Sequence, residues 1–326
     1  MVGASHVIWP DSRCCSAEVL DRARQTCRVL GIPYLQEDLV GEFRSRVVED
    51  FIATYLQGKT PNPCVICNKH IRFDTFYKRL LASLRSGDLL GARERLLFAT
   101  GHYARIVKTS GGTFLAKGID SRKDQSYMLY QVDRQMLSNM VLPLGEYRKT
   151  EVVSLAERMG LPYTRVRESQ DACFVKGSYV DFLCEQSGTT DLAQPGEIVD
   201  LRGRVLGRHR GTIHYTVGQR RGLGLADGPW YVAAIEPGTA RVVVARQEEA
   251  GRREFRIDRS NWFMEAPLDP RACTVKIRYQ IDEIPCTVQA ADRGFRVLME
   301  HSHIVSPGQS AVFYDRDLLI GGGIIL

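Results

Sequence analysis

Two cysteines, Cys64 and Cys67, lie three positions apart in the segment TPNPCVICNKHIRF, residues 60–73. A thiolate is both a nucleophile and a metal ligand, and it forms most readily where positive charge is close. The proline before the pair and the apolar spacing behind it predict a helix whose first turn contains Cys67, where backbone amides favour the thiolate. Basic side chains that follow act in the same direction: Lys69, His70 and Arg72. Cys67 is therefore predicted to be a reactive thiol, or a ligand when other groups join it.

Two other interpretations of the pair stay open at this point. A structural zinc site normally needs a second close pair of Cys or His ligands. The adjacent Cys14 and Cys15 have a poor geometry for chelating one ion, and Cys173 stands alone in the segment ESQDACFVKG. Burial in the core is the ordinary role of a single cysteine, although Pro-Asn-Pro beside two cysteines is an unusual core sequence. No metal is firmly assigned.

Basic side chains are concentrated in GRHRGTIHYTVGQRRGLG, residues 207–224, which has no acidic residue. It contains four arginines: Arg208, Arg210, Arg220 and Arg221. Arginines interleaved with glycine and an aromatic residue suit the phosphate backbone of a nucleic acid. A solvated loop between strands is the alternative, and a net charge of only +6 does not decide between them.

The composition is that of an ordinary globular protein. The 326 residues are 44% hydrophobic, and that length predicts two or more domains. There is no apolar run of about 18 residues to span a membrane and no basic-then-apolar leader for export. The nine cysteines are odd in number and scattered, which predicts a reducing, cytoplasmic setting rather than a disulfide framework.

The N-terminal half predicts alternating strands and helices. Residues 16–30 combine a capping serine with one apolar face and a following glycine, as a helix does. The apolar run at 96–100 predicts a short buried strand, and Gly101 and His102 follow its carboxyl end. Ligands bind at that end of the strands in open α/β sheets. We therefore expect an α/β domain with a parallel sheet over residues 1–165.

The sequence pattern changes near residue 166. Short segments separated by proline and glycine follow, and from about residue 252 the chain consists of short strands at regular spacing. This predicts a small central domain over residues 166–250 and a C-terminal β-barrel over residues 251–326.

Eight motifs, in order along nearly the whole chain, resemble the tRNA-specific 2-thiouridylases. They are GKTPNPCVICNKHIRF, ATGHYAR, KDQSYMLY, SQDACFVKG, YTVGQRRGLG, PWYV, VKIRY and SPGQSAVFYD. That family consists of PP-loop ATP pyrophosphatases that replace oxygen with sulfur at C2 of the wobble uridine of tRNA. The resemblance implies a doubly wound, HUP-like first domain, ATP with Mg²⁺ as cosubstrate, tRNA as partner, and a cysteine desulfurase or relay protein as sulfur donor.

The resemblance also implies a mechanism and two catalytic cysteines. ATP adenylates the C2 oxygen and makes it a leaving group, after which a persulfide on Cys173 delivers sulfur. Cys67 assists, leaving a transient Cys67–Cys173 disulfide and AMP. Because the reacting atom is part of a stacked base, the base must be taken out of the stack.

Further residues match family positions that contact substrates. The resemblance places Asn62, Pro63 and Cys64 at the target base, and Gly101 at ATP. It places seven other residues at tRNA: His102, Lys123, Asp124, Gln125, Arg278, Tyr279 and Gln309. Without the ordered motifs, Lys123 and Asp124 would be read as a surface ion pair of little value.

The chain departs from the family pattern at Cys64, where many members have aspartate. Three thiolates, from Cys64, Cys67 and Cys173, could hold a [4Fe–4S] cluster with one open iron position for an extra sulfide. The persulfide route is the first hypothesis and the cluster is the second.

The second departure concerns the nucleotide loop. The family loop has the form Ser-Gly-Gly-x-Asp-Ser and cradles pyrophosphate, and it is absent from this sequence. Ser110-Gly111-Gly112 lies between two strand-like segments and predicts a hairpin turn. The chain opens in register with the family's second strand, so we expect a misplaced start that omits about 30 residues, one β-α unit. The alternative is a tRNA-binding remnant without catalysis.

Overall fold

The computed structural model describes residues 1–10, 12, 15–91, 93–161, 172–188 and 193–326. It divides into two compact units. The first comprises Met1–Val48, Pro63–Lys176 and Asp317–Ile320, and the second Glu49–Asn62, Gly177–Arg316 and Gly321–Leu326. The predicted boundary at residues 165–166 lies outside the described residues. No helix in the described ranges is long and apolar enough to cross a membrane.

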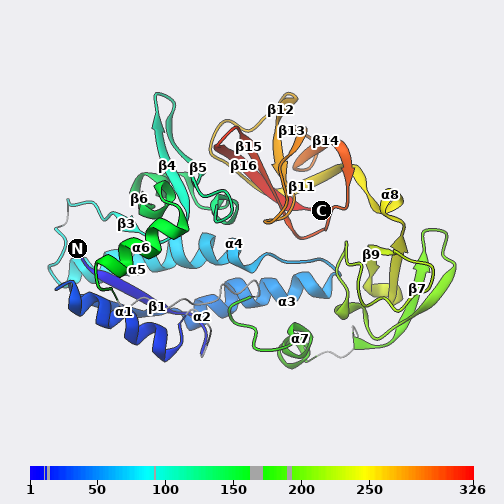
Figure 1. Ribbon diagram of the computed structural model, residues 1–326, viewed down its shortest axis with the longest axis horizontal. Helices are drawn as coiled ribbons and strands as arrows, with labels where there is room; N and C mark the ends of the chain where they lie inside the picture. The colour runs from blue at the N-terminus through cyan, green and yellow to red at the C-terminus, as the bar shows by residue number, and fades with distance from the viewer. Residues whose placement is uncertain (11, 13–14, 92, 162–171, 189–192) are drawn as a thin grey trace. The chain divides into compact units, whose positions relative to one another are not determined.

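The first unit alternates short strands with helical segments (Figure 1). These are β1 (Gly3–Val7), α1 (Ala17–Val29), β2 (Tyr34–Asp38), α2 (Val40–Phe43), η1 (Arg44–Val48), α4 (Pro63–Cys67), η2 (Asn68–Phe76), α5 (Tyr77–Ser86), β3 (Phe98–Ala99), β4 (Ala104–Thr109), β5 (Gly112–Lys117), η3 (Ser126–Leu129), η4 (Arg134–Asn139), β6 (Met140–Val141), η5 (Pro143–Glu146) and α6 (Lys149–Arg158).

Parallel pairing in this unit occurs in two separate pairs of strands. β1 pairs with β2, from Gly3 opposite Tyr34 onward, and β3 pairs with β6. Among the described residues these pairs form two two-stranded sheets rather than the single sheet expected from the sequence. The parallel direction and the strand before Gly101 agree with the prediction.

One helical face supports both parallel pairs. The ring of Phe76 in η2 lies 4.9 Å from that of His6 in β1 and 5.8 Å from that of Phe98 in β3. Apolar side chains of α4, η2 and α5 are buried at helical spacing: Val65, Ile71, Phe73, Phe76, Leu80 and Leu84. β1 and β3 therefore pack against the same stretch of helix, and Phe76 contacts a residue of each strand.

β4 and β5 form an antiparallel hairpin whose last pair is Thr109 opposite Gly112. The two residues between them, Ser110 and Gly111, make the turn. The predicted hairpin at Ser110-Gly111-Gly112 is therefore confirmed, and these residues do not form a phosphate-binding loop.

The second unit is mainly β-structure. Its elements are α3 (Glu49–Leu56), α7 (Tyr179–Ser187), β7 (Gly196–Asp200), β8 (Val205–His209), η7 (Thr212–His214), β9 (Tyr231–Glu236), η8 (Pro237–Thr239), β10 (Arg241–Ala245), α8 (Gln247–Ala250), β11 (Arg252–Trp262), β12 (Arg271–Lys276), β13 (Ile284–Ala290), β14 (Phe295–His303), β15 (Ser310–Asp315) and β16 (Leu318–Ile325), whose first residues belong to the first unit.

Two sheets organise these strands. A four-stranded sheet has the order β8-β7-β10-β9. The strands β11, β14, β13, β12, β15 and β16 pair in that order, and β11 also pairs with β16, which closes a six-stranded barrel. The predicted C-terminal barrel is therefore confirmed. Closure leaves no unpaired strand edge in the barrel.

Candidate functional site

The cysteine pair lies at the start of a helix, one turn earlier than predicted. α4 begins at Pro63, a favoured first helical residue because its missing N–H needs no partner there. Cys64 therefore occupies the first turn and is exposed, whereas Cys67 is half-buried at the end of α4. The prediction that Cys67 lies in the first turn is wrong, and the end of the helix dipole favours a thiolate more at Cys64.

Side chains just past Cys67 tie this helix to the segment around η3. Nδ2 of Asn68 donates to the carbonyl of Met128 at 3.0 Å, and Nζ of Lys69 donates to Oε1 of Gln131 at 2.8 Å. Asn68 and Gln131 are buried. The helix continues directly as the nine-residue π-helix η2. The position of Cys67 is thus fixed by hydrogen bonds as well as by packing.

His102 follows the carboxyl end of β3 in the chain and contacts η2, the helix that continues from α4. Its Nε2 is 3.2 Å from Nη1 of Arg72, and its Nδ1 is 2.8 Å from Oγ1 of Thr100. A guanidinium only donates, so Nε2 accepts and Nδ1 carries the proton. Burial, and then the charge of Arg72, lower the pKa of His102 to about 3. His102 is consequently a neutral imidazole of defined tautomer.

Arg72 also acts on a histidine of the other parallel pair. The pKa of His6, next to the carboxyl end of β1, is lowered to about 3 by burial and then by Arg72. The guanidinium further donates to Oδ1 of Asn68 at 3.2 Å. The carboxyl ends of β1 and β3 therefore share one cation, at the edge where open α/β sheets bind ligands.

Cys173 is held by its neighbours in the chain. Residues 172–175 form a turn in which the amide of Val175 donates to the carbonyl of Ala172 at 3.1 Å. Phe174 is buried, and its ring lies 6.2 Å from that of Trp9 and 5.5 Å from that of Phe43. Cys173 itself is half-buried. The segment directly before Cys173, residues 162–171, lies outside the described residues, as does Cys14.

The two residues after Lys123, Asp124 and Gln125, form hydrogen bonds within the protein. Oδ1 of buried Asp124 accepts from the amides of Gly118 and Ser126 at 3.0 and 3.1 Å, and Oδ2 accepts from Oγ of Ser126 at 2.9 Å. Gln125 makes two hydrogen bonds to the backbone of Tyr103, the residue after His102. Asp124 and Gln125 thus shape the loop of Gly101 and His102.

Gln309 in the second unit binds the segment that precedes α4. Its Nε2 donates to the carbonyls of both Thr60 and Pro61 at 3.1 Å. The amide of Thr60 in turn donates to the carbonyl of Pro307 at 2.8 Å. The residue before Asn62 is therefore fixed to the barrel unit by a side chain distant in the sequence.

Arg278 has an internal role in the same unit. Its Nη2 donates to Oγ of Ser306 at 2.6 Å and to the carbonyl of Val217 at 3.1 Å. A Cβ on Gly218 would collide with this guanidinium. Arg278 and Tyr279 are both half-buried. Arg278 thus joins the loop between β12 and β13 to the basic stretch that ends at residue 224.

That basic stretch borders a shallow cavity of about 270 Å³. The lining residues are Arg220, Gly222, Leu223, Gly224, Leu225, Gly228, Pro229 and Trp230. The guanidinium of Arg246 lies 3.9 Å from the centre of the Trp230 ring. Trp230 lies in the motif PWYV, whereas nothing in the sequence identifies Arg246, 16 positions further on, as its partner. An indole beside arginines is a surface on which a base can stack.

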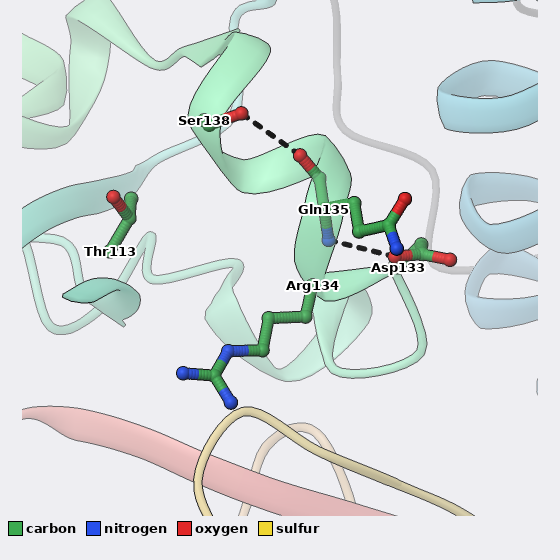
Figure 2. Close-up of a pocket in the computed structure, with 5 residues that line it drawn as sticks. All are labelled: Thr113, Asp133, Arg134, Gln135 and Ser138. Carbon is green, nitrogen blue, oxygen red and sulfur yellow. Dashed lines mark hydrogen bonds between the residues drawn. The ribbon is translucent and has the colours of Figure 1, made fainter. Parts of the chain in front are cut away.

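A second cavity, of about 440 Å³, contains none of the predicted site residues. Figure 2 shows its lining residues: Thr113, Asp133, Arg134, Gln135 and Ser138. The carboxylate of Asp133 accepts from the amide of Gln135 at 2.7 Å and so caps η4. The hydroxyl of Ser138 donates to the carbonyl of Gln135 at 3.0 Å. We assign the cavity no role.

The three candidate cysteines do not form a metal site. Within the described ranges, no group of three His, Cys, Asp or Glu side chains is placed to hold a metal ion. Cys64, Cys67 and Cys173 are all described, so their arrangement does not fit a cluster with three cysteine ligands. We therefore derive no chemical step through an iron–sulfur cluster.

Three family models match the chain. They are the tRNA methyl transferase HUP domain over residues 4–177, the tRNA methyl transferase PRC-barrel domain over residues 181–246, and the aminomethyltransferase β-barrel domain over residues 252–325. The predicted fold class, a HUP-like α/β domain followed by a central domain and a C-terminal β-barrel, is confirmed.

Curated relatives match over the length of the chain. The tRNA-specific 2-thiouridylase MnmA of Acidithiobacillus ferrooxidans is 42% identical over 330 residues, which covers 100% of this chain and 91% of that protein. MnmA of Moorella thermoacetica is 41% identical over 340 residues, covering 100% and 92%. The bifunctional protein NifU/MnmA of Rubrobacter xylanophilus is 44% identical over 322 residues, covering 97% and 62%. The chain therefore belongs to the family of MnmA, the tRNA-specific 2-thiouridylases.

Proposed function

We propose that this protein is a tRNA sulfurtransferase that converts the wobble uridine of tRNA to 2-thiouridine in an ATP-dependent reaction. The observation that carries the proposal is the 42% identity to a 2-thiouridylase over the full chain. The arrangement at α4 supports it, because this short helix carries both cysteines and the helix that continues from it contacts the loop after β3.

ATP supplies activation of the C2 oxygen of uridine, which is otherwise a poor leaving group. The terminal sulfur of a persulfide on Cys173 attacks C2, and AMP departs with the oxygen. The thiolate of Cys67 then attacks the Cys173 sulfur. The bond between that sulfur and the transferred one breaks, and its electron pair stays with the thiocarbonyl group of the product. A Cys67–Cys173 disulfide results. A thiol reductant then reduces it to the two thiols before the next turnover and is itself oxidised to a disulfide.

Other side chains hold and orient the substrates in this proposal. Gly101 contacts ATP, and Asn62, Pro63 and Cys64 contact the extruded base. His102, Lys123 and Gln309 lie along the tRNA, together with Tyr279. Asp124, Gln125 and Arg278 act chiefly as positioning residues, because their polar atoms bind neighbouring loops. His102 is neutral over the physiological range and acts as a hydrogen-bonding group rather than a cation.

The test combines purified protein, ATP with Mg²⁺, unmodified tRNA, a thiol reductant and a cysteine desulfurase with cysteine. We expect equal amounts of AMP and 2-thiouridine, measured by chromatography and nucleoside mass spectrometry. Cys67→Ser and Cys173→Ser should abolish 2-thiouridine, whereas Cys184→Ser, a half-buried cysteine of α7, should retain it. Retained thiolation in Cys173→Ser would refute the persulfide assignment.

A tRNA-binding protein without catalysis is the second candidate. The family's nucleotide loop begins with Ser-Gly-Gly. The sequence contains this tripeptide once, at residues 110–112, where it lies in a hairpin, and this favours the second candidate. That candidate predicts tRNA binding without tRNA-dependent AMP. Formation of AMP only when cognate tRNA is present excludes it.

A further inference from the structure

Two cysteines outside the proposed reaction face each other on the barrel. Cys273 in β12 and Cys286 in β13 are register partners of an antiparallel pair. Their Sγ atoms are 3.6 Å apart. Figure 1 shows β12 and β13 as neighbouring strands of the barrel. The two sulfurs are therefore close because of strand pairing, not because of a mobile loop.

The backbone at this pair meets the requirements of a disulfide. Directly opposite residues of an antiparallel pair have Cα atoms about 4.5–5.5 Å apart, and disulfides span Cα separations of about 4.4–6.8 Å. Opposite side chains also project to the same face of the sheet. Side-chain rotation alone has to bring the sulfurs from 3.6 Å to the bond length of about 2.05 Å.

The two thiols differ in access, and the pKa of the more buried one is raised. Cys273 is half-buried, whereas Cys286 is 7% exposed. The hydrogen bond to Cys273, followed by burial, raises the pKa of Cys286 far above that of an ordinary thiol. Cys286 therefore keeps its proton while a small reagent reaches Cys273 first.

We propose that Cys273 and Cys286 form a cross-strand disulfide by exchange with a low-molecular-weight disulfide, and that this bond locks the hairpin carrying Arg278 and Tyr279. The thiolate of Cys273 attacks one sulfur of the reagent, and the other leaves as a thiolate. Cys286 then attacks the Cys273 sulfur and displaces the second reagent thiolate. The two cysteine protons go to the two released thiolates, so the protein is oxidised and the reagent is reduced.

The bond would close the loop of residues 277–283 at its base. Thr274 and Glu283 already bridge the strands there, with Oγ1 of Thr274 2.5 Å from Oε2 of Glu283. The loop contains Tyr279, which the proposed function places along the tRNA, and Arg278, which it assigns to positioning. Oxidation should therefore pre-organise that contact and tighten tRNA binding about twofold to fivefold. This consequence rests on the proposed function, whereas the disulfide itself does not.

Trypsin provides a direct test, because Lys276 and Arg278 separate the two cysteines. Cleavage leaves Cys273 in the peptide ACTVK, residues 272–276, and Cys286 in YQIDEIPCTVQAADR, residues 279–293. Protein equilibrated with excess oxidised glutathione, then blocked with iodoacetamide and digested, should yield these peptides joined by a disulfide. Protein equilibrated with reduced glutathione should yield both peptides alkylated.

Matched variants make the outcome specific. Cys273→Ser should lose the joined peptide, and Cys184→Ser should retain it. Full alkylation of both peptides after oxidation, or glutathione attached to Cys273 without a link to Cys286, would overturn the proposal. These measurements on the unaltered protein stand even when a variant fails to fold. Equal tRNA affinity of the oxidised and reduced forms, with the joined peptide present, would overturn only the pre-organisation of the loop.

Discussion

The guanidinium of Arg72 donates to Nε2 of His102 at 3.2 Å, across 30 positions of the chain. This bond fixes a buried histidine as a neutral acceptor and leaves its Nδ1–H directed to Thr100. It also joins η2, which follows the cysteine pair, to the loop behind β3. A single arginine thus connects the candidate thiol segment with the candidate ligand edge of the first unit.

The first prediction concerns acid stability. The folded-state pKa of His102 is about 3 against an ordinary 6.5, so only the unfolded chain binds the proton as the pH falls below about 6.5. Folded stability is therefore complete above pH 6.5 and is lost progressively as the pH falls toward 3. At pH 5 the loss from His102 is about 2 kcal/mol. His6, whose pKa is lowered to about 3 by the same two causes, should add a loss of similar size.

Urea unfolding at pH 7 and pH 5 checks this. His102→Gln cannot titrate, so its stability should fall about 2 kcal/mol less than that of the parent over the same range. His301→Gln, at an exposed site, is the control for replacing a histidine elsewhere in the chain. A parent and a His102→Gln variant with parallel losses would show that His102 is protonated in the folded protein.

The second prediction concerns the carboxylate of Asp124. Asp124→Ala removes the acceptor of three hydrogen bonds and leaves the buried amides of Gly118 and Ser126 without it. The expected cost is about 2–4 kcal/mol in the free energy of unfolding. Asp120→Ala is the comparison. The carboxylate of Asp120 accepts from the backbone amides of Arg122 and Lys149. Its loss should cost less, because the Asp120 side chain is more accessible than that of Asp124. Equal losses would mean that burial does not set the value of these bonds.

The third prediction concerns Gly145. A Cβ at this position would collide with the backbone carbonyl oxygen of Ala104 in β4, so Gly145→Ala should destabilise the protein by about 3 kcal/mol or more. Gly111→Ala is the control, because its nearest neighbour would be 3.7 Å away, an ordinary contact. Thermal unfolding of the two variants should differ clearly. A Gly145→Ala variant as stable as Gly111→Ala would mean that η5 shifts without cost.

Local patterns predicted much of this fold. The hairpin turn at Ser110 and Gly111, the short strand before Gly101, the change to short strands and the barrel all follow from turn residues and strand spacing. The sequence pattern predicts Cys67 in the first helical turn, whereas α4 begins at Pro63, because a proline can be the first residue of a helix. Helix boundaries are set by such end effects, which periodicity alone does not reveal.

The site could be predicted less fully, because its contacts join distant residues. Nothing near His102 in the sequence identifies Arg72 as its partner, and Gln309 lies 248 positions from Pro61. The interruption of the parallel sheet into two pairs was likewise not expected. The resemblance implies that Asp124 and Gln125 contact tRNA, whereas their side chains bond to the backbone of Gly118, Ser126 and Tyr103, which the sequence does not reveal.

The last prediction concerns the basic stretch and tRNA. Arg220 and Arg221 are exposed beside the cavity at Trp230, and an arginine that contacts a phosphate releases counterions when it binds. Replacing both by glutamine should weaken tRNA binding and reduce the slope of log Kd against log salt by about 1–2. Arg28→Gln, an exposed arginine at the end of α1, should change neither quantity. Filter-binding titrations from 50 to 200 mM salt, about the range over which such slopes are resolved, provide the measurement. A double variant with the parent's slope would place the phosphate contacts elsewhere on the protein.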